Sequence, residues 1–400
     1  MQNSHRQLIF GLIAGFTLLQ LIILGVFGYT PYPDSNGYIL LAKESVALEE
    51  PYPVSSMLTK YPFLWNIGAI NAAAVSIALF NSVVPLLVVY SLMKGITAWM
   101  FYAIIKKICN TKIALIALIL YIIYPANYGE GTSTLSELPF MFFVMLGIYL
   151  SIVRNFSLIS GMMFAVANWF RPMAIIFLLA LMIFYLYKWR KSIKLILGYT
   201  IMIIVIGSCC YLRTGQFLYQ AKTGWMALID YSSGESKESQ LIRSRSDLNF
   251  SQKDDAWKSL FFDWLKENPN LYVAQIPKKF INTYLSDNVN MCTFIPDKDE
   301  KKYMYEDISM PILIHSFPKY SAVQWFTLLN LIIYYLFLIF SIFSLRYFKW
   351  TEYALPIGII LLGTLLLLFV GHGEARFHIP FMPFFIMLSS LFVYKIIWKE

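Results

Sequence analysis

The chain has 400 residues, of which 58% are apolar and only 14% are charged. A typical soluble domain carries about 25% charged residues, so the composition excludes an ordinary soluble protein. Apolar runs of roughly twenty residues recur, and each can cross a hydrocarbon core about 30 Å thick. The formal net charge of +9 does not indicate nucleic-acid binding, because the positions of the charges follow a membrane topology. The sequence therefore predicts an all-α polytopic membrane protein.

The first expected span covers residues 8–28, which lack a small-residue cleavage site and which we interpret as a retained anchor. Residues 157–187 contain Arg171 as their only charge and would overshoot the bilayer as one helix. Since Pro172 disfavours helical geometry at the residue before it, we expect a hairpin of two short helices here. Seven further spans bring the total to about ten or eleven: 83–105, 113–128, 135–153, 195–212, 322–345, 354–370 and 379–398.

Residues 63–80 could span the membrane or lie flat in the interface, because they are apolar but contain Asn66, Asn71 and Ser76. This choice decides on which side of the membrane every later loop lies. If they lie flat in the interface, thirteen Lys and Arg and two acids fall on the side of the N-terminus. The short loops on the other side then hold four Lys and Arg and seven acids. Cytoplasmic loops retain positive charge. We therefore expect an interfacial helix at 63–80, a cytoplasmic N-terminus and a multi-pass plasma-membrane protein.

The long segment 213–321 carries 14 Lys and Arg and 14 Asp and Glu, so we expect it to lie outside the membrane. Apolar residues at helical spacing form one stripe within it, and Pro269 opens a second amphipathic piece that reaches Tyr284; the stripe contains Trp257, Leu260, Phe261, Trp264 and Leu265. A small outer subdomain on the bilayer or the helix ends is predicted, with polymer binding as the alternative. The expected organisation is a transmembrane module at 1–212 with a first outer loop at 29–82, this subdomain at 213–321, and C-terminal helices at 322–400.

Two acids at the expected outer surface are candidate catalytic groups. Asp34 lies in a turn directly after the first span, where a carboxylate can meet a lipid head group and a polar acceptor together. Its alternative role is a helix N-cap. Glu137 begins an apolar run, where a carboxylate facing lipid costs on the order of 3 kcal/mol and so needs a cavity or a partner. Its alternative role is a first-turn acid with a capping contact from Thr134, and Glu130 gives a looser version of the same signal.

Candidate cations accompany these acids. Lys94 lies mid-span, about 17 Å from either helix end, so it cannot reach water and should face a carboxylate or phosphate inside the bundle. Arg171 and Arg376 lie near the outer surface, and arginine binds two phosphate oxygens at once. A local ion pair of Glu374 with Arg376 is the alternative. His372 and His378 flank Glu374, which leaves a divalent metal as a further alternative. The four cysteines show no metal-ligand spacing, so neither zinc nor disulfides are expected.

One membrane-proximal pocket with one or two carboxylates and three cations suits the transfer of a group from a lipid phosphate. A carboxylate can take the proton of an attacking hydroxyl. Arginine or lysine can stabilise the departing phosphate as its charge develops.

Short motifs along nearly the whole chain resemble those of the GT-C membrane glycosyltransferases. They are Asp34 in the first outer loop, Tyr61-Pro62 before an apolar stretch, Ser136-Glu137-Leu138-Pro139 at the head of a span, Phe170-Arg171-Pro172 in a hairpin, and Arg376-Phe377 followed by Pro380 and Pro383. Within that class the chain is most similar to the branch of protein mannosyltransferases and aminoarabinose transferases (glycosyltransferase family 39). The resemblance implies a GT-C-like bundle and a polyprenyl-phosphate-linked sugar donor. It also implies an extracytoplasmic active site and inversion at the anomeric carbon.

By position, Asp34 matches the family's first-loop catalytic acid and Glu137 its second carboxylate. The expected substrate-binding residues are Lys60, Tyr61, Lys94, Arg171, Glu374 and Arg376. The acceptor would be a lipid, glycan or protein. The first-loop acid stands without the Asp-Glu pair of eukaryotic protein mannosyltransferases, which argues against protein O-mannosylation. A transporter or flippase of the lipid-linked sugar, and a polysaccharide polymerase or ligase using a lipid diphosphate, remain alternatives.

Overall fold

The computed structural model describes residues 2–54, 64–234, 236–295, 308–371 and 373–398, and within these ranges the chain is helical, with one isolated β-bridge between Leu64 and Lys222. The α-helices are α1 (Gln2–Phe27), α2 (Pro33–Leu48), α4 (Ile67–Phe80), α5 (Val84–Ile108), α6 (Thr111–Ile123), α7 (Glu137–Ile152), α8 (Ser157–Phe170), α9 (Ala174–Phe184), α10 (Trp189–Thr214), α11 (Gly224–Ser233), α12 (Lys237–Ser244), α13 (Phe250–Glu267), α14 (Pro269–Tyr284), α15 (Met310–Ser316), α16 (Ala322–Ser344), α17 (Trp350–Phe369) and α18 (Met382–Trp398). Short 3-10 helices are η1 (Pro125–Tyr128), η2 (Glu130–Thr132), η3 (Val289–Phe294), η4 (Leu345–Tyr347) and η5 (Ala375–Phe381).

Six helices of the described chain are long and apolar enough to cross a membrane: His5–Phe27, Val84–Ile108, Trp189–Thr214, Ala322–Tyr347, Trp350–Phe369 and Ala375–Trp398. A seventh candidate is a pair bent by 71°, in which α6 is followed by Pro125–Thr132. The segment expected to span at 113–128 is therefore not one continuous helix: α6 ends at Ile123, because Pro125 cannot continue its hydrogen-bond ladder. The other three predicted spans are α7, α8 and α9, with 16, 14 and 11 residues. At 1.5 Å per residue, each is shorter than the hydrocarbon core.

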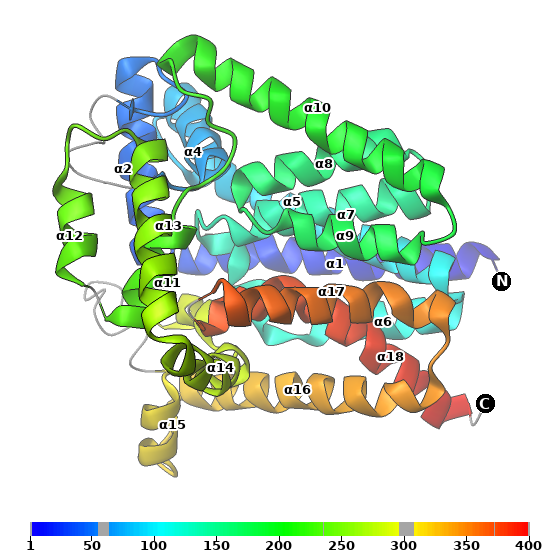
Figure 1. The fold of residues 1–400 in the computed structure, drawn as a ribbon. Helices are drawn as coiled ribbons and strands as arrows, with labels where there is room; N and C mark the ends of the chain where they lie inside the picture. The colour runs from blue at the N-terminus through cyan, green and yellow to red at the C-terminus, as the bar shows by residue number, and fades with distance from the viewer. Residues whose placement is uncertain (1, 55–63, 235, 296–307, 372, 399–400) are drawn as a thin grey trace.

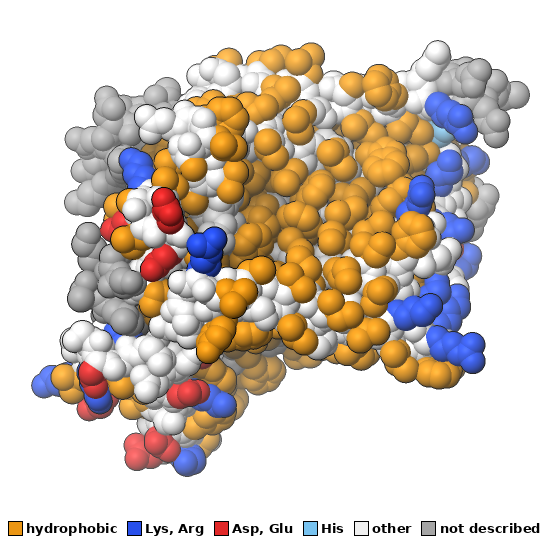
Figure 2. Space-filling view, turned by 90° about the horizontal axis from the view of Figure 1, so that it is seen from above, with side chains coloured by type: hydrophobic (Ala, Val, Ile, Leu, Met, Phe, Trp, Pro, Cys, Tyr) orange, Lys and Arg blue, Asp and Glu red, His pale blue; other side chains and the backbone are white. Residues whose placement is uncertain are grey.

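The long helices lie side by side, with both chain termini at one end of the bundle (Figure 1). Helices α2, α11 and α13 cross the opposite end, roughly at right angles to α1, α16 and α17. Figure 2 shows Lys and Arg gathered at the end with the termini, an apolar band in the middle, and mixed acidic and basic side chains at the other end. The two ends thus differ in charge in the way that the sequence predicts.

The segment 213–321 has a small core of its own, built mainly by α11, α13 and α14 around Leu228, Trp257 and Phe261. The predicted apolar stripe of α13 faces this core, and α14 begins at Pro269 and ends at Tyr284 as expected. The segment is not self-contained, however. Asn290 of η3 donates to Glu130 at 3.4 Å, so the segment also packs into the ends of the bundle helices.

Two local elements position the site. Helix α8 ends at Phe170 and α9 begins at Ala174, which confirms the predicted hairpin with Arg171 and Pro172 in its turn. Helix α4 has 14 residues and extends about 21 Å, so like α7, α8 and α9 it is shorter than the hydrocarbon core, and the interfacial position of 63–80 stays a prediction. Residue 63 itself, like Lys60 and Tyr61, lies outside the described residues.

Candidate functional site: an arginine–carboxylate cluster

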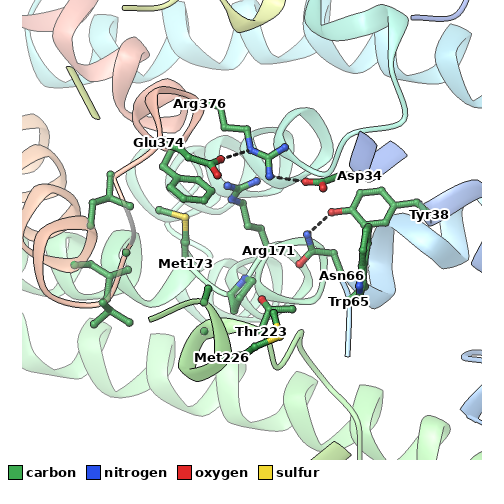
Figure 3. A pocket seen from close by; sticks show the side chains of 18 residues that line it. Asp34, Tyr38, Trp65, Asn66, Arg171, Met173, Thr223, Met226, Glu374 and Arg376 are labelled. Atoms are coloured by element: carbon green, nitrogen blue, oxygen red, sulfur yellow. Dashed lines mark hydrogen bonds and ion pairs between the residues drawn. The ribbon is translucent and has the colours of Figure 1, made fainter. Parts of the chain in front are cut away.

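Five charged side chains from separate parts of the chain meet at the end of the bundle that α2 crosses, and Figure 3 shows four of them, Asp34, Arg171, Glu374 and Arg376. They form the arginine–carboxylate cluster: Asp34, Glu137, Arg171, Glu374 and Arg376. The Arg376 Nη2 atom lies 2.5 Å from an Asp34 carboxylate oxygen, and its Nε lies 3.3 Å from Glu374 and 3.9 Å from Glu137. Arg376 therefore contacts all three acids of the cluster.

Asp34 reaches Arg376 from the first turn of α2. Tyr32 is the N-cap of this helix, and its backbone N–H donates a hydrogen bond to the Ser35 hydroxyl oxygen at 2.8 Å. The Tyr32 hydroxyl donates to the backbone carbonyl of Val289 at 2.8 Å, which holds the turn against η3. Asp34 is therefore not the N-cap, and its side chain, 31% exposed, is directed at the arginine.

Glu137 is the first residue of α7 and lies deeper than Asp34. One carboxylate oxygen is 2.5 Å from Arg171 Nη1, and the two side chains are only 6% and 8% exposed. The Arg171 guanidinium also stacks over the Phe377 ring, 4.9 Å from its centroid. The Ser136 hydroxyl donates to Glu137 at 3.3 Å, whereas Thr134 donates to Ser35 instead of forming the expected capping contact. Glu137 thus has buried ionic partners, as its position in an apolar run requires.

A cavity of about 390 Å³, which we call the cluster cavity, opens beside the arginine–carboxylate cluster. Asp34, Arg171, Glu374 and Arg376 line its polar wall, whereas Glu137 does not reach it. The other walls are largely apolar and come from α11, from the α8–α9 turn and from the end of α17; they include Met173, Met226, Leu366, Leu367 and Val370. The guanidinium groups of Arg171 and Arg376, beside the apolar walls of this cavity, can hold an amphiphile with an anionic head.

Tyr38 and Asn66 also line this cavity, and sequence reasoning missed them as site residues. The Asn66 amide donates to the Tyr38 hydroxyl at 2.8 Å and to the Ser136 hydroxyl at 3.1 Å, which ties α2 to the head of α7. Tyr38 lies four residues after Asp34 and so on the same face of α2. The four-residue spacing from Asp34 is the signal in the sequence that could have identified Tyr38 as a site residue.

Lys94 does not belong to this cavity. Its ammonium group is hydrogen-bonded to Glu130, and the two side chains are 6% and 10% exposed. The expectation that Lys94 faces a carboxylate inside the bundle is confirmed, and its partner is the acid with the looser sequence signal. Together with Asp287 and Asn290, the pair lines a separate small cavity of about 20 Å³. The prediction that Lys94 binds the substrate together with the cluster residues is wrong, because Lys94 does not line the cluster cavity.

His378 does not line the cluster cavity either. It is fully buried, with Nδ1 2.6 Å from the Thr283 carbonyl oxygen and Nε2 3.7 Å from Asp287 Oδ1. Burial raises the pKa of Asp287 to about 7, and nearby Lys94 lowers it in part. His372 lies outside the described residues. Among the residues that the structure describes, no three His, Cys, Asp or Glu side chains are grouped to hold a metal ion.

A comparison with protein-family models and with curated proteins finds no match for this chain. The fold and the site define its class: an all-α multi-pass membrane protein with an arginine–carboxylate cluster at one end of its bundle.

Proposed function

We propose that the protein is a glycosyltransferase that moves a sugar from a polyprenyl-phosphate-linked donor to an acceptor hydroxyl or phosphate, with inversion. The single observation that carries the proposal is the contact of Arg376 with Asp34, Glu137 and Glu374 beside a cavity with an apolar wall. The cluster lies at the end of the bundle opposite the Lys- and Arg-rich end. By the positive-inside rule, that end is extracytoplasmic.

The donor's two parts match the two kinds of wall. Arg171 and Arg376 offer planar guanidinium groups that suit a phosphate, since arginine can bind two of its oxygens at once. The apolar side chains near the end of α17 suit the first units of the prenyl chain. Arg376 is bonded to Asp34 in this structure, so a phosphate that binds Arg376 would compete with the carboxylate and release it.

Asp34 is the proposed general base. The acceptor oxygen attacks the anomeric carbon and forms the new carbon–oxygen bond, while its proton passes to the Asp34 carboxylate. The bond between the anomeric carbon and the phosphate oxygen breaks, and its electron pair leaves with the phosphate. Arg171 and Arg376 would stabilise the charge that develops there.

Glu137 is assigned a positioning role, because it does not reach the cavity and holds Arg171 at 2.5 Å. The three carboxylates of the cluster face arginines rather than one another, so they do not form a ready ligand set for a divalent metal. The proposed mechanism uses the arginines to neutralise the phosphate.

A transporter of the same lipid-linked sugar is the second candidate. The buried Lys94–Glu130 pair favours it, since ionisable residues inside a membrane domain often mark a transport path. Against it, the cavity beside this pair has a volume of only about 20 Å³, room for about one water. A polymerase or ligase would differ from the proposed enzyme in using a lipid diphosphate donor.

The test is reconstitution of the full chain with a labelled polyprenyl-phosphate sugar and an acceptor extract. We expect release of polyprenyl phosphate and labelled product, and a loss of at least about 100-fold for Asp34→Asn, as is typical when a general base is removed. Asp263→Asn, an exposed acid of α13, is the matched control and should keep full activity. Transbilayer movement of label without cleavage would instead support the transporter, and full activity of Asp34→Asn would remove the base from the mechanism.

A further inference from the structure

A second large cavity lies far from the arginine–carboxylate cluster, in the groove between α1 and α5. This α1–α5 groove has a volume of about 580 Å³ and shares no lining residue with the cluster cavity. Its apolar walls are Ile9, Phe10, Ile13, Leu92, Ile96 and Trp99. Phe10 is 75% exposed and belongs to the candidate span His5–Phe27, so its side chain would face lipid in a membrane.

The rim of the groove is cationic. His5, Arg6 and Lys106 line it, with Tyr102 between them, and none of the described residues that line the groove is acidic. The Tyr102 hydroxyl lies 3.3 Å from His5 Nε2, and its ring lies 6.0 Å from Lys106 Nζ. Tyr102 therefore links the rim groups of α1 and α5. Lys106 is in the last turn of α5, at the end of the bundle where Lys and Arg gather.

The length of the groove matches one leaflet. Along α1 it runs from Arg6 at the rim to Thr17, eleven residues or about 17 Å. Half of a hydrocarbon core is about 15 Å. At the inner end, a Cβ on Gly95 would lie 1.9 Å from Thr17 Oγ1, so the two helices approach closely there and close the groove near the midplane.

We propose that the α1–α5 groove is a binding site for one anionic phospholipid of the leaflet at the Lys- and Arg-rich end. Its phosphate lies at Arg6 and Lys106, and one acyl chain lies along Ile13, Ile96 and Trp99. The cationic rim, with no acid among the described residues that line the groove, selects a net negative head group over a zwitterionic one. The single-leaflet depth selects an acyl chain over a longer prenyl chain. This site is independent of the proposed enzymatic activity.

The test is native mass spectrometry of the purified full chain, titrated with phosphatidylglycerol or phosphatidylcholine of the same acyl composition. We expect one tightly retained phosphatidylglycerol and weaker phosphatidylcholine binding. The variant Arg6→Gln/Lys106→Gln should lose about fivefold in phosphatidylglycerol affinity for each cation removed. Lys107→Gln is the matched control, because this neighbouring lysine is also exposed but does not line the groove, and its affinity should stay unchanged.

A second variant tests the apolar part. Ile96→Trp fills the wall of the groove on an exposed helix face, so it should fold normally and lose retention of the acyl chain. Equal affinity for the two phospholipids, an equal loss in Lys107→Gln, or full retention by Ile96→Trp would each overturn the proposal. Displacement of phosphatidylglycerol by a lower concentration of polyprenyl phosphate would also overturn it, since the occupant would then be a prenyl lipid.

Discussion

The Arg171–Glu137 ion pair is almost excluded from solvent, so at the scale of single residues a substitution of either partner should strongly lower the stability of the fold. Removing one partner of a buried pair leaves an uncompensated charge, which typically costs about 3–5 kcal/mol. We therefore expect Arg171→Met to lower the free energy of unfolding by about that amount. The double variant Arg171→Met/Glu137→Gln should recover most of it. Chemical unfolding in detergent measures both values.

The exposed Lys266–Asp263 pair supplies the control for this cycle, because its side chains are 76% and 69% exposed. Lys266→Met should change the unfolding free energy by less than about 1 kcal/mol. If Arg171→Met is equally mild, the buried pair does not hold the head of α7, and the positioning role assigned to Glu137 fails.

Asp287 makes stability depend on pH. Its folded pKa is raised to about 7 by burial, whereas an unfolded aspartate titrates near 4. Between these values the folded state holds a proton that the unfolded state has lost, so the contribution of Asp287 to stability falls as pH rises from about 4 to 7 and is constant above. The charged or titratable groups near Asp287 include His378, Lys94 and Tyr334. We expect Asp287→Asn to flatten this part of the unfolding profile, and an unchanged slope would assign it to another group.

The residues that sequence reasoning found and those it missed differ for a physical reason. Glu137, Arg171 and Lys94 stand alone in apolar runs, where an unpaired charge is costly, so each required a partner. Which of these charges pair with one another was not predictable, because the members of each pair lie far apart in the sequence and only the fold brings them together. Asp287 is one of 14 acids in the segment 213–321, and nothing in that composition distinguishes it. Only the fold buries it.

At the scale of elements, two glycines allow the backbones of α8 and α10 to approach each other closely. A Cβ on Gly161 of α8 would lie 2.0 Å from the Leu195 backbone oxygen of α10, and one on Gly198 would lie 1.9 Å from the Leu158 oxygen. Backbone cannot yield as a side chain can, so alanine at either position must push α10 away from α8. We expect Gly161→Ala and Gly198→Ala each to cost about 1–3 kcal/mol in unfolding free energy.

Gly11 of α1 is the matched control for these variants, because a Cβ there meets nothing within 4 Å. Gly11→Ala should be neutral or stabilising by up to about 1 kcal/mol, since alanine favours the helix. Losses of similar size at all three glycines would mean that the close α8–α10 contact is not the cause.

The sequence was sufficient to predict helices and their amphipathic faces, but it was less informative about where each helix ends. The stripe of α13, the start of α14 and the α8–α9 turn follow from spacing and proline positions alone. The bend after α6 was missed although Pro125 marks it, because an uninterrupted apolar run outweighed one proline. Hydropathy also cannot tell a full span from the 11-residue helix α9, since neighbouring helices bury both.

The whole molecule is polarised along the bundle axis. Lys and Arg gather at the end with both termini (Figure 2), and the arginine–carboxylate cluster lies at the other end, which α2 crosses. If the positive end is cytoplasmic, the cluster cavity opens outward, where a flipped lipid-linked sugar would be found. The reverse orientation would expose the cavity to the cytoplasm and leave the proposed donor out of reach.

Single cysteines test this orientation once the native ones, Cys109, Cys209, Cys210 and Cys292, are replaced by alanine or serine. Ser246→Cys places an exposed thiol on the segment 213–321, and Lys107→Cys places one at the basic end of α5. A membrane-impermeant maleimide added to intact cells should label Ser246→Cys. It should label Lys107→Cys only after permeabilisation, and the cysteine-free protein not at all. The opposite pattern would place the cluster inside the cell, and the extracytoplasmic transfer proposed for Asp34 would have to be abandoned while the α1–α5 lipid site, defined by its own rim, would stand.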